Sequence, residues 1–332
     1  MSPQGKKLFK KILSWASYFF FFLAAYMIYL QLHKYEFQEI VDSISEIPNM
    51  NLVYAGMASF LGYIALSLYD FLALKYVRRK LSSWKWIMAG FVGFSISNNA
   101  GHAILSGGTI RYRFYTRWRL KASEIVKMVM FSGFTYLWAC CGLIILGYFL
   151  TPSHAFGDGS VSYVTTLVVV IGSALALLLY FILVIFYRKS LTIKGIEFHM
   201  PTFGLALSQV IIGGADILLA SLVLYFALIP FVHIDFSVFI GVFIIAQVLG
   251  VYSQVPGGLG VFEGLFMYIL PDEEDKAGIF AALIAYRIIY YLLPLVISGF
   301  IISAYEGGLR HRMVKAKEDY LLRKRSRQQN HS

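Results

Sequence analysis

Charged residues are scarce in this sequence, and their scarcity excludes a water-soluble protein. Lysine, arginine, aspartate and glutamate together make up 14% of the 332 residues, whereas 58% are hydrophobic and the mean hydropathy is +0.68. A single core cannot bury that much apolar surface. The composition therefore predicts a polytopic integral membrane protein.

Cysteine and the familiar catalytic motifs are equally scarce. The two cysteines, Cys140 and Cys141, are adjacent within an apolar run, so they indicate neither a disulfide framework nor a metal site. The seven histidines lack the spacing of metal ligands. No glycine-rich segment matches the nucleotide-binding pattern G-x-x-x-x-G-K-[ST]. We therefore expect no enzyme activity, no metal and no cofactor.

Long apolar runs are what the sequence has in abundance. A hydrocarbon core about 30 Å thick requires about 20 residues of helix, and six runs meet that length. They cover residues 12–32, 52–74, 128–150, 161–187, 203–229 and 277–304. Two more apolar runs, 86–115 and 236–270, are interrupted in the middle by glycine-rich breaks. These two runs decide the expected architecture.

The positive-inside rule fixes how the interrupted runs meet the membrane. Most of the 29 lysines and arginines fall in five clusters, at 6–11, 75–85, 111–127, 188–194 and 310–327. If all five clusters are cytoplasmic, the interrupted runs must each enter the membrane and return to the side from which they came. We therefore expect two re-entrant helical hairpins that dip from opposite faces, with both termini in the cytoplasm.

Each expected hairpin carries small residues at its non-helical tip. Such backbone is tolerated at membrane depth only where protein or a wet cavity surrounds it. In the first hairpin the expected break comprises Asn98-Asn99-Ala100-Gly101 and the tip residues Ser106, Gly107 and Gly108. In the second hairpin the tip residues are Pro256, Gly257, Gly258 and Gly260.

The order helix, helix, hairpin, helix occurs twice, the second time starting from the opposite side. This order predicts an inverted repeat within one membrane domain that spans residues 1–332. The first repeat covers 12–150, the second covers 161–304, and 305–332 form a basic cytoplasmic tail. The expected fold class is therefore all-α, with six transmembrane helices and two opposed re-entrant hairpins.

Ionisable residues inside membrane segments are the candidate binding residues, because a charge in the bilayer usually faces a cavity or a partner. They are Asp70, Asp216, Glu263 and Arg287, with Arg111 and Arg113 at the inner edge of the first hairpin. Guanidinium groups match phosphate oxygens, so we expect Arg113 and Arg287 to hold a lipid phosphate. The carboxylates would bind an amine headgroup, relay protons or reset the arginines. The alternative is that these charges pair with one another and only hold the hairpins.

Three segments carry a family resemblance. Residues 106–117, 255–263 and 285–294 resemble the hallmark segments of the lysylphosphatidylglycerol synthase transmembrane family. That family includes the membrane half of the multiple peptide resistance factor, a flippase for aminoacylated phosphatidylglycerol. The chain length and the run Thr192-Ile-Lys-Gly195 look most like its stand-alone YbhN-type bacterial branch. Bifunctional members add a soluble aminoacyl-transferase domain after the membrane part, so we do not expect lysyl transfer here.

Together these features predict a flippase-like transporter in the bacterial cytoplasmic (inner) membrane. It would move a phospholipid or a related amphiphile between leaflets. A lipid-binding or scaffolding membrane protein that transports nothing is the alternative. The basic tail is expected to meet anionic lipid headgroups rather than nucleic acid, and assembly into a homo-oligomer is left open.

Overall fold

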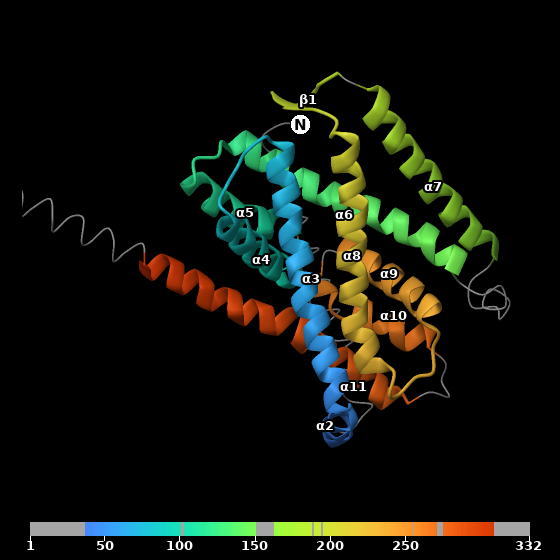
Figure 1. The fold of residues 1–332 in the computed structure, drawn as a ribbon. Coiled ribbons are helices and arrows are strands. Elements are labelled where there is room, and N and C mark those ends of the chain that lie inside the picture. Colours follow the sequence, from blue (N-terminus) through green and yellow to red (C-terminus); the bar gives the residue numbers. More distant parts are fainter. Residues whose placement is uncertain are drawn as a thin grey trace, which may run out of the picture.

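The computed structural model describes residues 37–100, 103–150, 163–187, 189–193, 195–253, 255–270 and 275–308. Long helices dominate this part of the chain (Figure 1). The first expected membrane helix, 12–32, and most of the expected basic tail lie outside the described residues.

Five of the described helices are long and apolar enough to cross a membrane. They are α3 (Asn49–Tyr76), α6 (Ala122–Leu150), α7 (Tyr163–Phe186), α8 (Phe203–Leu228) and the last helix, which runs from Lys276 to Gly308. They coincide with five of the six runs expected from the sequence. The last helix begins as α11 (Lys276–Tyr286) and passes through the π-helical turn η3 (Arg287–Leu292).

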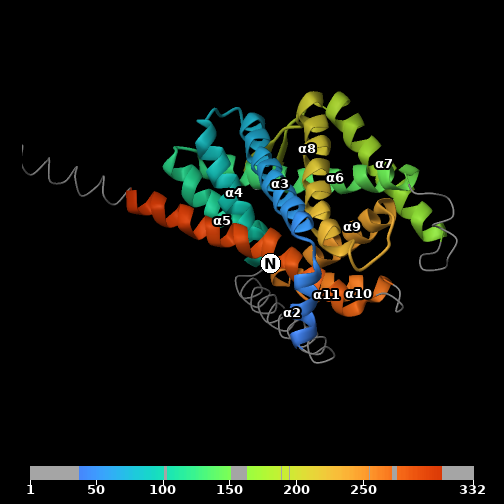
Figure 2. The same cartoon turned by 60° about the horizontal axis from the view of Figure 1, so that its bottom comes forward.

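Helices α3 and α8 lie side by side at the centre of the bundle and run in opposite directions (Figures 1 and 2). Near the start of α3, the Asn51 side chain donates a hydrogen bond to the Phe226 carbonyl near the end of α8. Helix α6 packs closely on α8, because a Cβ placed on Gly213 would lie 2.6 Å from Ala139 Cβ. Small residues permit this close approach, as is typical of helix packing in membranes.

The first interrupted run forms two adjacent helices, α4 (Ser83–Ala100) and α5 (Ala103–Arg117). The expected break at 98–101 agrees with the end of α4 at Ala100. The expectation for Ser106, Gly107 and Gly108 is wrong, because these residues lie inside α5. The physical reason is helix packing: a Cβ on Gly107 would lie 2.9 Å from Ser97 Oγ and 3.0 Å from the Gly93 carbonyl oxygen. The glycine pair therefore serves the close contact of α5 with α4 and does not form the turn.

The second interrupted run breaks where the sequence predicts. It forms α9 (Phe236–Tyr252), the short 3₁₀ turn η2 (Pro256–Gly258) and α10 (Val261–Ile269). Gly257, Gly258 and Gly260 have φ of +62°, +63° and +78°, a region that side chains disfavour and glycine tolerates. These three glycines let the chain turn tightly between α9 and α10.

The two helix pairs connect at opposite ends of the central helices (Figure 1). Helices α4 and α5 join the end of α3 to the start of α6, whereas α9 and α10 join the end of α8 to the start of α11. Since α3 and α8 are antiparallel, the two pairs extend toward each other from opposite ends of the molecule.

Two smaller features complete the described fold. Helix α2 (Phe37–Glu46) packs on α11. Strands β1 (Leu191–Ile193) and β2 (Ile196–Phe198) form an antiparallel hairpin between α7 and α8, with Leu191 opposite Phe198. This hairpin is the one departure from an all-α fold among the described residues.

Candidate functional site

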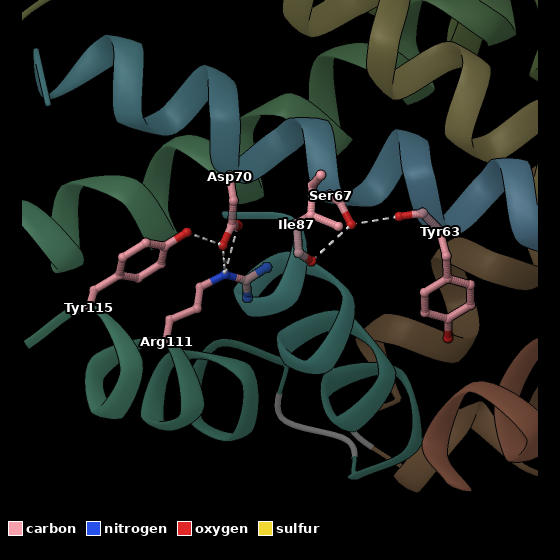
Figure 3. A network of polar contacts seen from close by, with 6 residues as sticks. All are labelled: Tyr63, Ser67, Asp70, Ile87, Arg111 and Tyr115. Atoms are coloured by element: carbon pink, nitrogen blue, oxygen red, sulfur yellow. Dashed lines mark hydrogen bonds and ion pairs between the residues drawn. The ribbon is translucent and has the colours of Figure 1, made fainter. Parts of the chain in front are cut away.

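The first buried charge cluster joins α3 to α5 (Figure 3). Arg111 Nε lies 2.8 Å from Asp70 Oδ1 and 3.2 Å from Oδ2, and the Tyr115 hydroxyl donates to Oδ2 at 2.7 Å. Asp70 is 0% exposed and Arg111 is 3% exposed. The guanidinium carbon of Arg111 also lies 4.2 Å from the ring centroid of Phe94.

The sequence builds this cluster through helical spacing and a glycine. Arg111 and Tyr115 are four residues apart on α5, so both side chains emerge on the same face and reach Asp70. Gly93 of α4 leaves room for the guanidinium, because a Cβ there would lie 3.2 Å from Arg111 Cζ. The cluster therefore ties the first helix pair to the central helix α3.

The second buried cluster lies at the tip of the other helix pair. Arg287 Nε lies 2.5 Å from Glu263 Oε1, and Arg287 Nη1 donates to the Gly257 carbonyl oxygen at 2.5 Å. The backbone N–H of Gly260 donates to Glu263 Oε2 at 2.7 Å, which closes the first turn of α10. Arg287 therefore binds both the glycine tip and the helix that follows it.

Both arginines retain a donor that is not used. Within the described residues, Nη2 of Arg111 and Nη2 of Arg287 are buried and have no hydrogen-bond partner. Buried polar groups are normally satisfied, so an unpaired guanidinium N–H in such a place requires an explanation. The ring of Tyr291, 4.5 Å from Arg287 Cζ, stabilises the cation but does not accept that hydrogen bond.

The tips of the two helix pairs meet beside Arg287. A Cβ on Gly257 would lie 3.5 Å from Arg287 Nη1 and 3.6 Å from the Asn98 carbonyl oxygen of α4. The Asn99 side chain donates to the Tyr291 carbonyl at 3.0 Å. Segments from the two halves of the chain are thus in contact at this point.

The π-helical turn η3 is held by side chains from α3 as well. Ser59 Oγ donates to the Ile289 carbonyl and the Tyr63 hydroxyl donates to the Tyr290 carbonyl, each at 3.0 Å. Single π turns inside α-helices are frequent at functional sites. Here the turn begins with Arg287, the residue that contacts the tip.

Asp216 of α8 is the third buried carboxylate, at 5% exposure. Its Oδ2 accepts a hydrogen bond from the Tyr69 hydroxyl of α3 at 3.0 Å. No lysine or arginine of the described residues forms an ion pair with it. Asp216 therefore links the two central helices through a neutral partner.

Arg113 does not join either buried cluster. Its side chain is 51% exposed, and its Nη2 lies 2.5 Å from Glu306 Oε1 near the end of the last helix. Arg117 contacts the same oxygen at 3.2 Å. Glu306 is 19 residues beyond Arg287 on one helix, or about 28 Å at 1.5 Å per residue. The structure therefore does not bring Arg113 and Arg287 together as expected.

Three members of these clusters were not expected from the sequence, namely Tyr69, Tyr115 and Asn99, and Gly257 was expected as a tip residue but not as an acceptor for Arg287. The sequence does contain a pattern that points to Tyr115, since this residue follows Arg111 by one helical turn and therefore lies on the same face of α5. A pattern also points to Asn99, because Asn98-Asn99 is a polar pair inside an apolar run. In the described residues, no three histidine, cysteine, aspartate or glutamate side chains are grouped to hold a metal ion.

A bundle of five apolar helices that could cross a bilayer, with buried charges near its centre, defines a polytopic helical membrane protein. The family model for the lysylphosphatidylglycerol synthase TM region matches residues 14–298. The chain belongs to this family, and the resemblance expected from its motifs is confirmed.

Curated relatives match almost the whole chain. The uncharacterized protein slr0712 of Synechocystis sp. is 33% identical over 301 residues, which cover 88% of this chain and 90% of that protein. The inner membrane protein YbhN of Escherichia coli is 29% identical over 302 residues, covering 88% and 91%. The phosphatidylglycerol lysyltransferase of Staphylococcus xylosus is 26% identical over 291 residues, covering 86% of this chain but only 33% of that enzyme. These similarities support a location in the bacterial inner membrane.

Proposed function

We propose that this protein is a flippase-like transporter that moves a phospholipid or a related amphiphile between the leaflets of the bacterial inner membrane. Its family and the name of its Staphylococcus xylosus relative connect it to phosphatidylglycerol lipids. The observation that carries the proposal is the buried Arg287 guanidinium, which has an unpaired N–H where the two helix pairs meet. A phosphate group is the ligand that suits such a guanidinium.

In this proposal the lipid headgroup enters between the two tips and its phosphate replaces Glu263 on Arg287. Glu263 and Asp216 then receive an amine on the headgroup, or take up protons, and Glu263 returns to Arg287 after release. Residues 12–150 and 161–304, as inverted repeats, rock around this point. Both termini and the basic clusters lie on the cytoplasmic side. We assign no lysyl transfer to the residues of this chain, since the lysyltransferase match covers one third of that enzyme.

A lipid-binding or scaffolding role is the second candidate. The contacts of Glu263 and Arg287 within the protein already satisfy most of the hydrogen-bonding groups of both side chains. Such a pair can hold a tip in place without any movement of lipid. The two roles differ in what happens when both charges are removed together. A structural pair can be replaced as a unit, whereas a phosphate site cannot lose its cation.

The deciding experiment measures scrambling of fluorescent phospholipids in proteoliposomes. The variants are Arg287→Gln, Glu263→Gln, the double variant of both, and Lys189→Gln as a control on an exposed residue that belongs to neither buried charge cluster. Each variant is first checked for monodisperse elution and cooperative melting. A transporter predicts that the folded double variant loses at least about tenfold in rate, while the control keeps the wild-type rate. A double variant that folds and scrambles like wild type would leave the ion pair as a structural element only.

A further inference from the structure

A second candidate binding site lies far from the tips, at the end of the molecule where α3 ends and α6 begins. A pocket of about 290 Å³ opens there. It is lined by Tyr76, Val77, Arg78, Glu124, Lys127 and His199. The β-hairpin closes one side, because the Tyr76 hydroxyl donates to the His199 carbonyl at 2.7 Å. The positive-inside rule puts this end of α3, within the basic cluster 75–85, on the cytoplasmic side.

The pocket has an excess of cations without partners. Glu124 is the acidic residue in its lining, and both of its oxygens are occupied. Oε1 lies 3.0 Å from Arg79 Nε, and Oε2 accepts the Lys121 backbone N–H at 2.8 Å. Among the described residues, no carboxylate pairs with Arg78 or Lys127. The lining is therefore electropositive.

Arg78 also adopts a backbone conformation that favours glycine. Its φ is +55°, and it follows α3 in a Schellman-type ending, in which the Arg79 N–H donates to the Leu74 carbonyl at 2.9 Å. Glycine is the usual residue at this position because it has no Cβ. A strained non-glycine residue at the edge of a pocket is a reason to look for a function of its side chain.

Arg119 provides an internal comparison. It ends α5 in the same way, with φ of +65° and a hydrogen bond from the Leu120 N–H to the Tyr115 carbonyl at 3.0 Å. Arg119 does not line the pocket. Replacing either arginine with glycine should relieve the same strain, but only Arg78 would remove a cation from the pocket.

We propose that this pocket binds a phosphate-bearing anion through Arg78 and Lys127, independently of the transport site. The guanidinium offers paired N–H donors that match phosphate oxygens, and the ammonium adds a point charge. The volume is at the lower end of ligand pockets, so it suits a lipid headgroup or a small phosphate ester. The shared chemistry is a phosphomonoester or phosphodiester at the cytoplasmic surface.

The test measures binding to the full chain in a neutral maltoside detergent. Glycerol 1-phosphate represents the free ester and short-chain phosphatidylglycerol represents the lipid, with glycerol as the uncharged control. We expect Arg78→Gly and Lys127→Gln each to weaken binding about fivefold, which corresponds to about 1 kcal/mol per basic residue. Arg119→Gly should leave binding unchanged.

Melting temperature separates binding from folding. Both glycine variants should melt at or above the wild-type temperature, so lost binding by Arg78→Gly cannot arise from unfolding. The binding that Arg78→Gly removes reports on this pocket and not on the transport site. If that part is tighter for phosphatidylglycerol than for glycerol 1-phosphate, the ligand is a lipid headgroup; if it is equal for both, the ligand is a free ester. The proposal is overturned if neither compound saturates, or if Arg78→Gly and Arg119→Gly change affinity equally.

Discussion

Removing either Asp70 or Arg111 alone should destabilise the protein more than removing both together. Asp70→Asn leaves the buried guanidinium of Arg111 without its counter-ion, and Arg111→Gln leaves the Asp70 carboxylate with only the Tyr115 hydroxyl. Removing one member of a buried pair typically costs about 3–5 kcal/mol, because an uncompensated charge stays in the interior. Both side chains are at most 4% exposed here, so solvent cannot relieve that cost.

The double variant Asp70→Asn with Arg111→Gln should recover most of the loss. Two neutral amides leave no unpaired charge, and replacing a whole buried pair is often close to neutral. The free energies of the single variants should therefore fail to add by several kcal/mol, far above the 0.5 kcal/mol or so seen for independent sites. Tyr115→Phe should cost about 1.5–3 kcal/mol, since it removes a hydrogen bond to a charged group.

Reversible unfolding in mixed micelles, followed by tryptophan fluorescence, measures these differences. The expected result is a low midpoint for each single variant and a midpoint near wild type for the double variant. Additive losses, or single variants that lose less than about 1 kcal/mol, would refute the reasoning that this pair is desolvated and mutually dependent.

Two further outcomes follow from the same contacts. Arg113→Ala should cost less than about 1 kcal/mol in unfolding free energy, because its pair with Glu306 is half exposed; a larger loss in the same unfolding assay would contradict the exposed position. Gly213→Ala should lower stability by about 1–3 kcal/mol, since the new Cβ would lie 2.6 Å from Ala139 Cβ. Thermal melting of Gly213→Ala checks this loss, with Gly172→Ala as the control, because a Cβ on Gly172 would meet nothing within 4 Å.

Length and hydropathy were enough to predict the five described membrane-length helices. The second break was predictable as well, because Pro256 and three nearby glycines disfavour a continuous helix. The first break was predictable only in part: the 98–101 segment coincides with the end of α4 at Ala100, whereas residues 106–108 do not interrupt α5. Gly107-Gly108 has the composition of a turn, yet it packs against Gly93 and Ser97 inside a helix. Only the spacing of small residues on α4, with Gly93 and Ser97 four apart, could have pointed to that contact.

The buried charges were predictable as a set but not as pairs. Hydropathy marks Asp70, Glu263 and Arg287 as exceptional in their apolar runs. Which partner each one finds depends on contacts between distant segments, such as Asp70 with Arg111 across 41 positions. Arg111 and Arg113 illustrate the difficulty, since they are two residues apart and therefore point to different sides of α5. One is buried and the other meets Glu306.

The π turn at 287–292 sets the rotational phase of the last helix. Such a turn contains one more residue than an α turn, and one residue corresponds to a rotation of about 100° about the helix axis. Where the turn begins, Arg287 meets Glu263, and beyond the turn, near the end of the helix, Glu306 meets Arg113. Deleting a single residue from the turn would rotate one end against the other, so the helix could keep only one of these contacts. The extra residue thus sets the rotation between the two parts of the last helix, so that one helix can contact both halves of the protein.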